Sequence, residues 1–235
     1  VLGSLINPRR SVEDLYVAEY DELHPLLEKA FEIEARDDTA HELAVVAHGI
    51  AKAAEILASQ FTLVATNVPY LARGKQNDTL RDHVEKHYND GRADLATVFV
   101  LRCLDICSTG GSAAVVTPQN WLFLTTYTKL RENLLTHQKW NIVARLGQNA
   151  FQDMNWWAAT TALVVISADN PQQWIMSGLD VSADKAQDVK ASRLANHIST
   201  SVESIAQSAQ LSNPDARIGF GEQSTHSLLE EYAVS

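Results

Sequence analysis

The sequence predicts an α/β fold in which parallel strands close with an antiparallel hairpin. Two observations carry this prediction. Short apolar runs alternate with longer helical patterns between residues 61 and 166, which is the rhythm of a parallel sheet with crossover helices. The last apolar run, Thr160–Ile166, follows its predecessor after a loop too short to contain a crossover helix. It should therefore pair antiparallel with the preceding strand.

Composition indicates a reduced globular protein without membrane spans. The 235 residues are 46% hydrophobic and 20% charged, and no apolar run is long enough to cross a bilayer. Two cysteines, four residues apart in an expected helix, give no disulfide framework and suit a reduced, cytoplasmic protein. Because Val1 opens directly on apolar sequence with neither an initiator methionine nor a signal peptide, we expect a piece of a longer protein.

Residues 1–60 are expected to form a helical segment before the first strand. The capping-box pattern Ser11–Asp14 predicts a helix that continues to about Arg36. A second helix is expected over residues 39–59, where apolar side chains recur every three or four positions. The positions expected to form its buried face are Leu43, Val46, Ala47, Ile50, Ala54 and Leu57.

The first strand is expected at Phe61–Ala65 and leads into four unusual residues. The run is too continuously apolar for a half-exposed edge, so we expect it to be covered on both faces. Asn67, Val68, Pro69 and Tyr70 then stand at its carboxyl end. Open α/β sheets place their ligand crevice at that end.

The remaining elements follow the same alternation. Helices are expected around His83 and His87, over Asp94–Cys107 up to Gly110–Gly111, and over Leu124–His137; strands are expected at Ala113–Thr117 and Asn141–Leu146. His83 and His87 have a spacing that can bind zinc, but a third ligand is missing from the pattern, so no metal site is expected. The polar tail should contain a helix over Ala183–Ala209, ended by Pro214.

Several stretches together resemble the adenine-specific (N6) DNA methyltransferases. Asn67–Tyr70 is similar to their Asn-Pro-Pro-Tyr motif, with Val68 in place of the first proline. The stretches that resemble large methylases of fused restriction-modification enzymes and BREX-type phage-defence systems are Gly111–Leu122, Tyr127–Arg131 and Ala150–Asp153 leading into Thr160–Ala162. The resemblance is close over residues 61–167 and looser at Gly3–Ile6. It implies that residues 61–167 are the C-terminal, catalytic half of a Rossmann-like methyltransferase sheet, and that residues 168–235 are a helical tail leading to a target-recognition region.

The motif has a chemical logic of its own. An adenine amine is a poor nucleophile because its lone pair is delocalised into the ring. If the Asn67 side-chain oxygen and the Val68 carbonyl each accept one N6 hydrogen, the lone pair is aimed at the methyl donor, and alignment supplies much of the catalysis. Tyr70 offers a stacking surface for a flipped-out base, and Pro69 stiffens the turn. The alternative is an ordinary strand-to-loop turn.

The resemblance also implies partners and further residues. Phe151 matches the aromatic residue that sandwiches the base against Tyr70, although a plain loop aromatic is the alternative and Trp156 and Trp157 compete for the role. S-adenosylmethionine is the implied cofactor, and its glycine-rich loop is expected upstream of Val1, so cofactor-binding residues are unknown here. Gly219-Phe-Gly221 is interpreted as a chance pattern, with a permuted cofactor loop as the alternative.

Double-stranded DNA is the implied partner, yet the net charge of −10 is unfavourable for phosphate binding. The basic residues Arg73, Lys75 and Arg81, just after the motif, are the candidate backbone contacts, with a solvated face as the alternative. We therefore expect an internal fragment of an N6-adenine DNA methyltransferase that is inactive alone. Methylation of a protein glutamine amide and a catalytically idle DNA-binding scaffold remain alternatives. No oligomeric state is predicted.

Overall fold

The computed structural model describes residues 2–8, 38–148, 150, 160–195 and 202–220. The chain divides into two compact units, Val1–Gln60 and Phe61–Ser235. In the first unit, a short 3-10 helix η1 spans Gly3–Leu5 and the long helix α2 spans Asp38–Ala58, which confirms the second predicted helix. The helix expected to begin at Ser11 lies outside the described residues.

The prediction that the whole apolar face of α2 is buried is wrong, because its described side chains range from half-buried, as at Ala47, Ala54 and Leu57, to exposed. Val46 and Ile50 are 59% and 66% exposed. A helical apolar repeat shows which face can be buried, but burial also needs a partner element.

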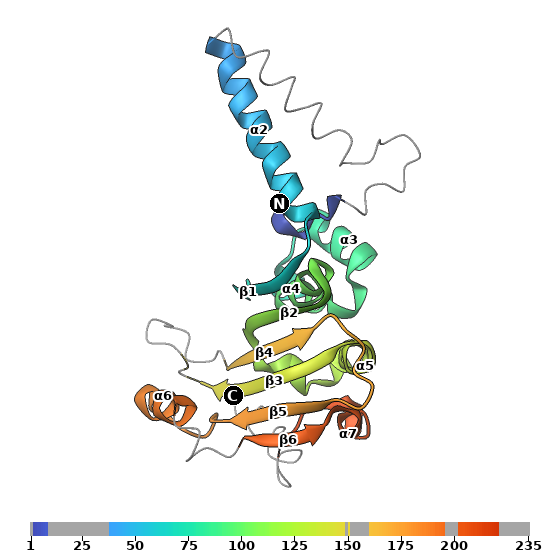
Figure 1. Ribbon diagram of the computed structural model, residues 1–235, viewed down its shortest axis with the longest axis vertical. Coiled ribbons are helices and arrows are strands. Elements are labelled where there is room, and N and C mark those ends of the chain that lie inside the picture. The colour runs from blue at the N-terminus through green and yellow to red at the C-terminus, as the bar shows by residue number, and fades with distance from the viewer. Residues whose placement is uncertain (1, 9–37, 149, 151–159, 196–201, 221–235) are drawn as a thin grey trace. The chain divides into compact units, whose positions relative to one another are not determined.

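The second unit is built on a mixed six-stranded sheet with the order β1-β2-β4-β3-β5-β6 (Figure 1). The strands are β1 Phe61–Asn67, β2 Cys107–Pro118, β3 Lys139–Gly147, β4 Thr161–Ser167, β5 Ile175–Asp180 and β6 Glu203–Ala206. β1 pairs parallel with β2, and β3 pairs parallel with β5. β4 lies between β2 and β3 and is antiparallel to both, which confirms its predicted pairing with β3. The α/β class and the antiparallel pairing of β4 are therefore as predicted, but the sheet does not close at this hairpin, because β5 and β6 continue it beyond β3.

Helices cover both faces of this sheet. The described helices and helical turns of the unit are η3 Arg73–Lys75, α3 Asp78–His87, η4 Asn89–Gly91, α4 Leu95–Asp105, η5 Gln119–Leu122, η6 Thr125–Tyr127, α5 Thr128–His137, α6 Gln187–Ala195, α7 Gln207–Gln210 and η7 Pro214–Ala216. α4 packs against β2 and α5 against β3 on the side of the main hydrophobic core (Figure 1). Leu194 of α6 packs against a second cluster that contains Ala144, on the opposite face of β3 from the core residue Val143.

β2 begins six residues earlier than the predicted strand. Cys107 belongs to β2 rather than to the helix, and the strand continues through Gly110 and Gly111 instead of a helix ending there. A Cβ atom on Gly111 would lie 2.7 Å from the Phe61 carbonyl oxygen, so glycine is needed for this close approach. The pairing of β1 with β2 shifts register between Phe61 and Leu63 at the same place.

β1 is present as predicted, but the expectation that both its faces are covered is wrong. It lies at the edge of the described sheet and pairs only with β2. Leu63 is 61% exposed, and Val64 alone among the strand's residues is even partly buried. The apolar run indicates a strand whose faces could be buried. Among the described residues, however, the strand is paired along one edge with β2 and its faces stay largely exposed.

The predicted helical tail is replaced by strands and short helices. In place of one helix over residues 183–209, the structure has α6, β6 and α7, with β5 preceding them. Tertiary packing explains the difference. A Cβ atom on Gly178 of β5 would lie 1.9 Å from the Phe220 ring, so this strand position requires glycine under a buried aromatic side chain. Pro214 begins η7 rather than ending a long helix.

Candidate active site

The first two motif residues are fixed by the pairing of β1 with β2. Asn67 is the last residue of β1, is exposed, and pairs with Val116. The Val68 N–H donates to the Val116 carbonyl at 3.3 Å, while the Val68 side chain is only 3% exposed in the core. Within the described residues, neither the Asn67 side chain nor the Val68 carbonyl has a hydrogen-bond partner. Two acceptors of neighbouring residues are thus available at the carboxyl end of the strand.

Tyr70 connects this turn to the core. Its ring is half-buried and packs against the main hydrophobic cluster, so only part of the ring remains available as a stacking surface. Its hydroxyl is buried and has no hydrogen-bond partner among the described residues. Burial, followed by the nearby Asp94 carboxylate, raises the pKa of Tyr70, so the phenol stays neutral at physiological pH. Pro69, between Tyr70 and the buried Val68, is exposed.

Two of the three predicted DNA contacts are already paired with carboxylates of α3. Arg73 forms an ion pair with Glu85, and Arg81 forms one with Asp78. Lys75 is exposed and forms no ion pair with any residue that the structure describes. Exposed ion pairs contribute little stability, so a phosphate could replace either carboxylate at small cost.

Several predicted aromatic positions cannot be placed. Phe151, Trp156 and Trp157 lie outside the described residues. Gly219 and Phe220 are described and are part of the packed interior: the Gly219 N–H donates to the Gln210 side chain at 3.0 Å, and Phe220 is buried.

Three buried polar side chains near the carboxyl end of β2 were not identified from the sequence. Gln119 is 1% exposed and its amide oxygen has no partner among the described residues; the hydroxyl of Thr161, whose residue pairs with Pro118, is in the same situation. Arg131 is fully buried and donates hydrogen bonds to four backbone carbonyls. Two of them lie in the segment that follows β2, and two lie in η7. All three lie in stretches that resemble the methylases, Gly111–Leu122, Thr160–Ala162 and Tyr127–Arg131, but the sequence does not show that these polar side chains are buried.

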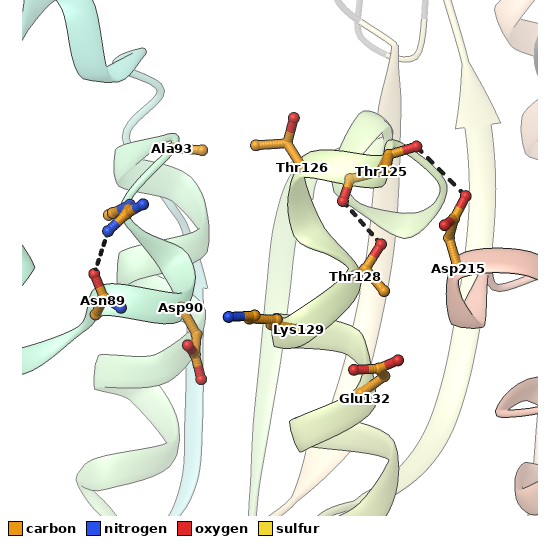
Figure 2. Close-up of a pocket in the computed structure, with 10 residues that line it drawn as sticks. Asn89, Asp90, Ala93, Thr125, Thr126, Thr128, Lys129, Glu132 and Asp215 are labelled. Carbon is orange, nitrogen blue, oxygen red and sulfur yellow. Dashed lines mark hydrogen bonds between the residues drawn. The ribbon is translucent and has the colours of Figure 1, made fainter.

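A cavity of about 560 Å³ lies between the segment around η4 and the segment that contains η6 and α5 (Figure 2). It is lined by Asn89, Asp90, Arg92, Ala93, Thr125, Thr126, Thr128, Lys129, Glu132 and Asp215. Ala93 links it to the loop that follows the Asn67–Tyr70 turn, because its carbonyl accepts the Arg73 N–H at 3.0 Å. Lys129 extends into the cavity from α5, but three carboxylates outnumber the two cations (Figure 2). This mixed lining does not favour an anion.

The described ranges contain no group of three or more side chains that could hold a metal ion, and His83 and His87 are close neighbours on α3 with ring centroids 4.6 Å apart. None of the helices traced in these ranges is both long and apolar enough to cross a bilayer.

Sequence comparison identifies relatives over much of the chain. Residues 11–151 match the Eco57I restriction-modification methylase family. Adenine-specific methyltransferase PglX of Lacticaseibacillus casei (strain Zhang) is 33% identical over 121 residues, which are 51% of this chain and 10% of PglX. Adenine-specific methyltransferase BrxX of Escherichia coli O9:H4 (strain HS) is 28% identical over 165 residues, which are 70% of this chain and 13% of BrxX. The chain thus spans about a tenth of the length of these relatives.

Solved structures share the fold. A nuclease-deletion mutant of the Type ISP restriction-modification enzyme LlaGI, in complex with a DNA substrate mimic, matches with a TM-score of 0.52 at 13% identity, over 82% of this chain and 21% of LlaGI. A structure of a type I restriction-modification system matches with a TM-score of 0.50 at 13% identity, over 88% of this chain and 57% of the other. Since the family match covers more than half of its residues, the chain belongs to the Eco57I restriction-modification methylase family.

Proposed function

We propose that this chain carries the target-base half of an N6-adenine DNA methyltransferase of the restriction-modification or BREX type. The observation that carries the proposal is the pair of available acceptors at the end of β1, the exposed Asn67 amide and the Val68 carbonyl, next to the partly open Tyr70 ring. The names of PglX and BrxX and the DNA substrate mimic bound to LlaGI support the same substrate.

In this proposal, the two acceptors act on the adenine amine. The Asn67 side-chain oxygen accepts one N6 hydrogen and the Val68 carbonyl accepts the other, so the nitrogen lone pair is turned out of conjugation. Because the Val68 side chain is buried and its N–H is bonded to Val116, the carbonyl is held by the sheet rather than by a mobile loop. Proximity and orientation of this kind account for much of the rate enhancement of enzymes.

Tyr70 holds the base once it has left the duplex. A base stacked on an aromatic ring gains about 1–3 kcal/mol, and the packing of Tyr70 against the core keeps the ring in place without ordering it during binding. Phe151 remains the proposed partner on the other side of the base. Lys75, and Arg73 or Arg81 after exchange of their carboxylate partners, are the proposed phosphate contacts.

S-adenosylmethionine is the proposed cofactor and supplies an electrophilic methyl group when bound. The described residues match only the part of such a site that holds the target base. None of the described strands leads into a turn with several glycines beside Asn67, and the strand that carries Asn67 is exposed at the sheet edge. We therefore place the cofactor-binding residues outside the described ones.

Asn67→Ala tests the proposal in a full-length protein that carries this chain. Methylation of adenine in duplex DNA should fall by about a hundredfold or more, because loss of one such hydrogen-bond partner typically has that effect. Asn133→Ala, which removes an exposed amide on α5, is the matched control and should leave the rate unchanged. Turnover of Asn67→Ala within a few-fold of the wild type would overturn the assignment.

Two further arms separate the alternatives. A protein substrate with an accessible glutamine should remain unmethylated beside the DNA, because methylation of that amide would identify a protein methyltransferase instead. Absence of methyl transfer to either substrate would identify an idle scaffold. Val68→Pro should keep activity, because the carbonyl remains, and should lose only about 1 kcal/mol of stability with the 3.3 Å bond from its N–H.

A further inference from the structure

The chain that leaves the Asn67–Tyr70 turn is bound to the segment that begins α4. The Leu95 N–H donates to the Leu71 carbonyl at 3.0 Å, and the Arg73 N–H donates to the Ala93 carbonyl at 3.0 Å. The two segments therefore run side by side as a short antiparallel pair. The residue directly after Tyr70 is thereby fixed to the start of a buried helix rather than to solvent.

A single carboxylate oxygen completes this attachment. Asp94 is the N-cap of α4, and its Oδ1 accepts the Ala96 N–H at 2.9 Å. The same oxygen accepts the Leu71 N–H at 3.3 Å. The Leu71 carbonyl receives a second hydrogen bond, from the Gln76 side chain at 3.1 Å. Both polar groups of the Leu71 backbone are thus held, and within the described residues Asp94 is the only hydrogen-bond partner of the Leu71 N–H.

We propose that Asp94 is a positioning residue for methyl transfer, which acts through Leu71 on the orientation of the Tyr70 ring and the Val68 carbonyl. The inference rests on the proposed function. Tyr70 lies between two fixed points, the Val68 N–H bonded to β2 and the Leu71 N–H bonded to Asp94. Loss of the Asp94 bond leaves the Leu71 N–H without its partner, and this side of the turn is then held only by the hydrogen bonds of the Leu71 carbonyl and the Arg73 N–H. Displacement of a reacting group by about 1 Å can lower a rate by about a hundredfold, so a loose turn should slow the chemical step more than DNA binding.

The electrostatic surroundings agree with this placement. Two effects raise the pKa of Tyr70: burial, which is the larger, and the charge of Asp94. The carboxylate therefore lies close to the phenol ring. The Tyr70 hydroxyl forms no hydrogen bond with any described residue, so the ring itself is oriented by packing and by its backbone. Asp94 holds the backbone next to Tyr70 through its hydrogen bond from the Leu71 N–H.

Substitutions at Asp94 can separate the two roles of this oxygen. Asp94→Asn keeps an oxygen that can accept both N–H groups. Asp94→Ser keeps N-cap ability, because serine is a strong N-cap, but its shorter side chain does not reach Leu71. Asp94→Ala loses both. Asn77→Ser is the matched control, because Asn77 caps α3 through the Leu80 N–H at 2.9 Å and its side chain forms no hydrogen bond with the described residues of the turn.

The experiment uses a full-length protein that carries this chain and measures four quantities for each variant: urea stability, DNA affinity, the single-turnover methylation rate and hydrogen exchange of the peptide that contains Leu71. For Asp94→Ser we expect stability and DNA affinity close to wild type, a methylation rate at least about tenfold lower and faster exchange at Leu71. Asp94→Asn should restore the rate to within a few-fold, and Asn77→Ser should change neither rate nor exchange at Leu71.

Three outcomes would overturn the inference. Unchanged hydrogen exchange at Leu71 in Asp94→Ser would show that the carboxylate does not hold this backbone. This outcome is independent of the proposed function. Faster exchange with an unchanged methylation rate would show that the hold does not matter for chemistry, while the proposed function stands. A wild-type protein that methylates no adenine would overturn the proposed function and this inference with it.

Discussion

Arg131→Met should be among the most destabilising single substitutions in the second unit. The Arg131 side chain is fully buried and uses four hydrogen bonds to backbone carbonyls. Two go to the segment after β2, at 2.6 Å to Trp121 and 2.8 Å to Leu124, and two go to η7, at 2.7 Å to Asp215 and 3.1 Å to Ala216. Methionine fills a similar volume without any donor, so the change isolates the polar contribution.

The expected loss of stability depends on two quantities: the hydrogen bonds that the four carbonyls lose, and the desolvation cost of burying the guanidinium in the wild type. Hydrogen bonds from a charged donor contribute about 1.5–3 kcal/mol each, so four would sum to more than about 6 kcal/mol. Two terms reduce that sum. The bonds to Leu124 and Asp215 are only part-buried, so those carbonyls can regain water. Burial also lowers the pKa of Arg131 to about 10, which records a desolvation cost that methionine does not have, although the group stays protonated at neutral pH. We therefore expect a loss of about 3–5 kcal/mol.

Urea unfolding of the chain, followed by tryptophan fluorescence, measures this loss. Trp121 and Trp140 are both fully buried, with ring centroids 5.5 Å apart, so their emission should change on unfolding. Lys129→Met is the matched control: it removes an exposed cation from the same helix and should change the free energy of unfolding by less than about 0.5 kcal/mol. A loss below about 1 kcal/mol for Arg131→Met would refute the reasoning, because it would mean that the four carbonyls are equally well satisfied without the guanidinium.

Four other predictions concern thiol reactivity, the pH dependence of stability, a buried amide oxygen and the cofactor. Burial raises the pKa of the Cys103 thiol to about 11 and also raises that of Cys107, so neither should react with a thiol reagent near pH 7 until the chain unfolds; rapid labelling of the folded chain would contradict this. The same raised pKa means that stability should fall as pH rises from the ordinary thiol value near 9 towards 11, because the unfolded chain releases its proton first. Gln119→Leu should leave stability unchanged or raise it by about 1 kcal/mol, since it removes a buried amide oxygen without a described partner; a loss in urea unfolding would reveal hidden bonds. The chain alone should show no micromolar binding of S-adenosylmethionine in calorimetric titration, because good ligand sites bury about 70% or more of the ligand, whereas Asn67 lies on an exposed edge strand; measurable micromolar affinity would place the cofactor site within this chain.

Strands with strong apolar runs could be predicted because their signal is local. Residues 113–117 and 160–166 are continuously apolar or β-branched; the first run falls inside β2, and all of the second except its first residue falls inside β4. The antiparallel direction of β4 followed from loop length alone. The early start of β2 at Cys107 could not be predicted in this way, because Gly110 and Gly111 read as a helix terminator. Only the close approach of the Phe61 carbonyl shows why glycine stands in a strand there.

β5 and β6 were missed because tertiary packing decides them. β5 contains a serine, a glycine and an aspartate among six residues, and β6 has only four residues, so neither shows a strand period. Gly178 weakens β5 as an isolated strand, yet in the folded chain it provides the space for the Phe220 ring, more than forty residues later. Such a contact has no signature in the sequence around either residue.

The candidate site, like the fold, could be predicted from the sequence only in part. Asn67–Tyr70 could be found because polar, proline and aromatic residues directly follow an apolar strand, and the structure brings them to the carboxyl end of β1. Asp94 could be recognised from sequence only as a helix start. Its second bond, to Leu71, joins residues 23 positions apart and depends on how α4 returns beside the turn.

The carboxyl end of the sheet is built in part by the last described residues of the chain. Ile218 is fully buried and its N–H donates to the Leu122 carbonyl at 2.9 Å, while Arg131 joins the same segment after β2 to η7. That segment follows directly from the strand whose Val116 carbonyl holds the Val68 N–H. Residues near 215–220 are therefore mechanically connected, through β2, to the turn that carries Asn67. A substitution that loosens η7 should consequently affect the geometry of the turn, although it lies about 150 positions away in sequence.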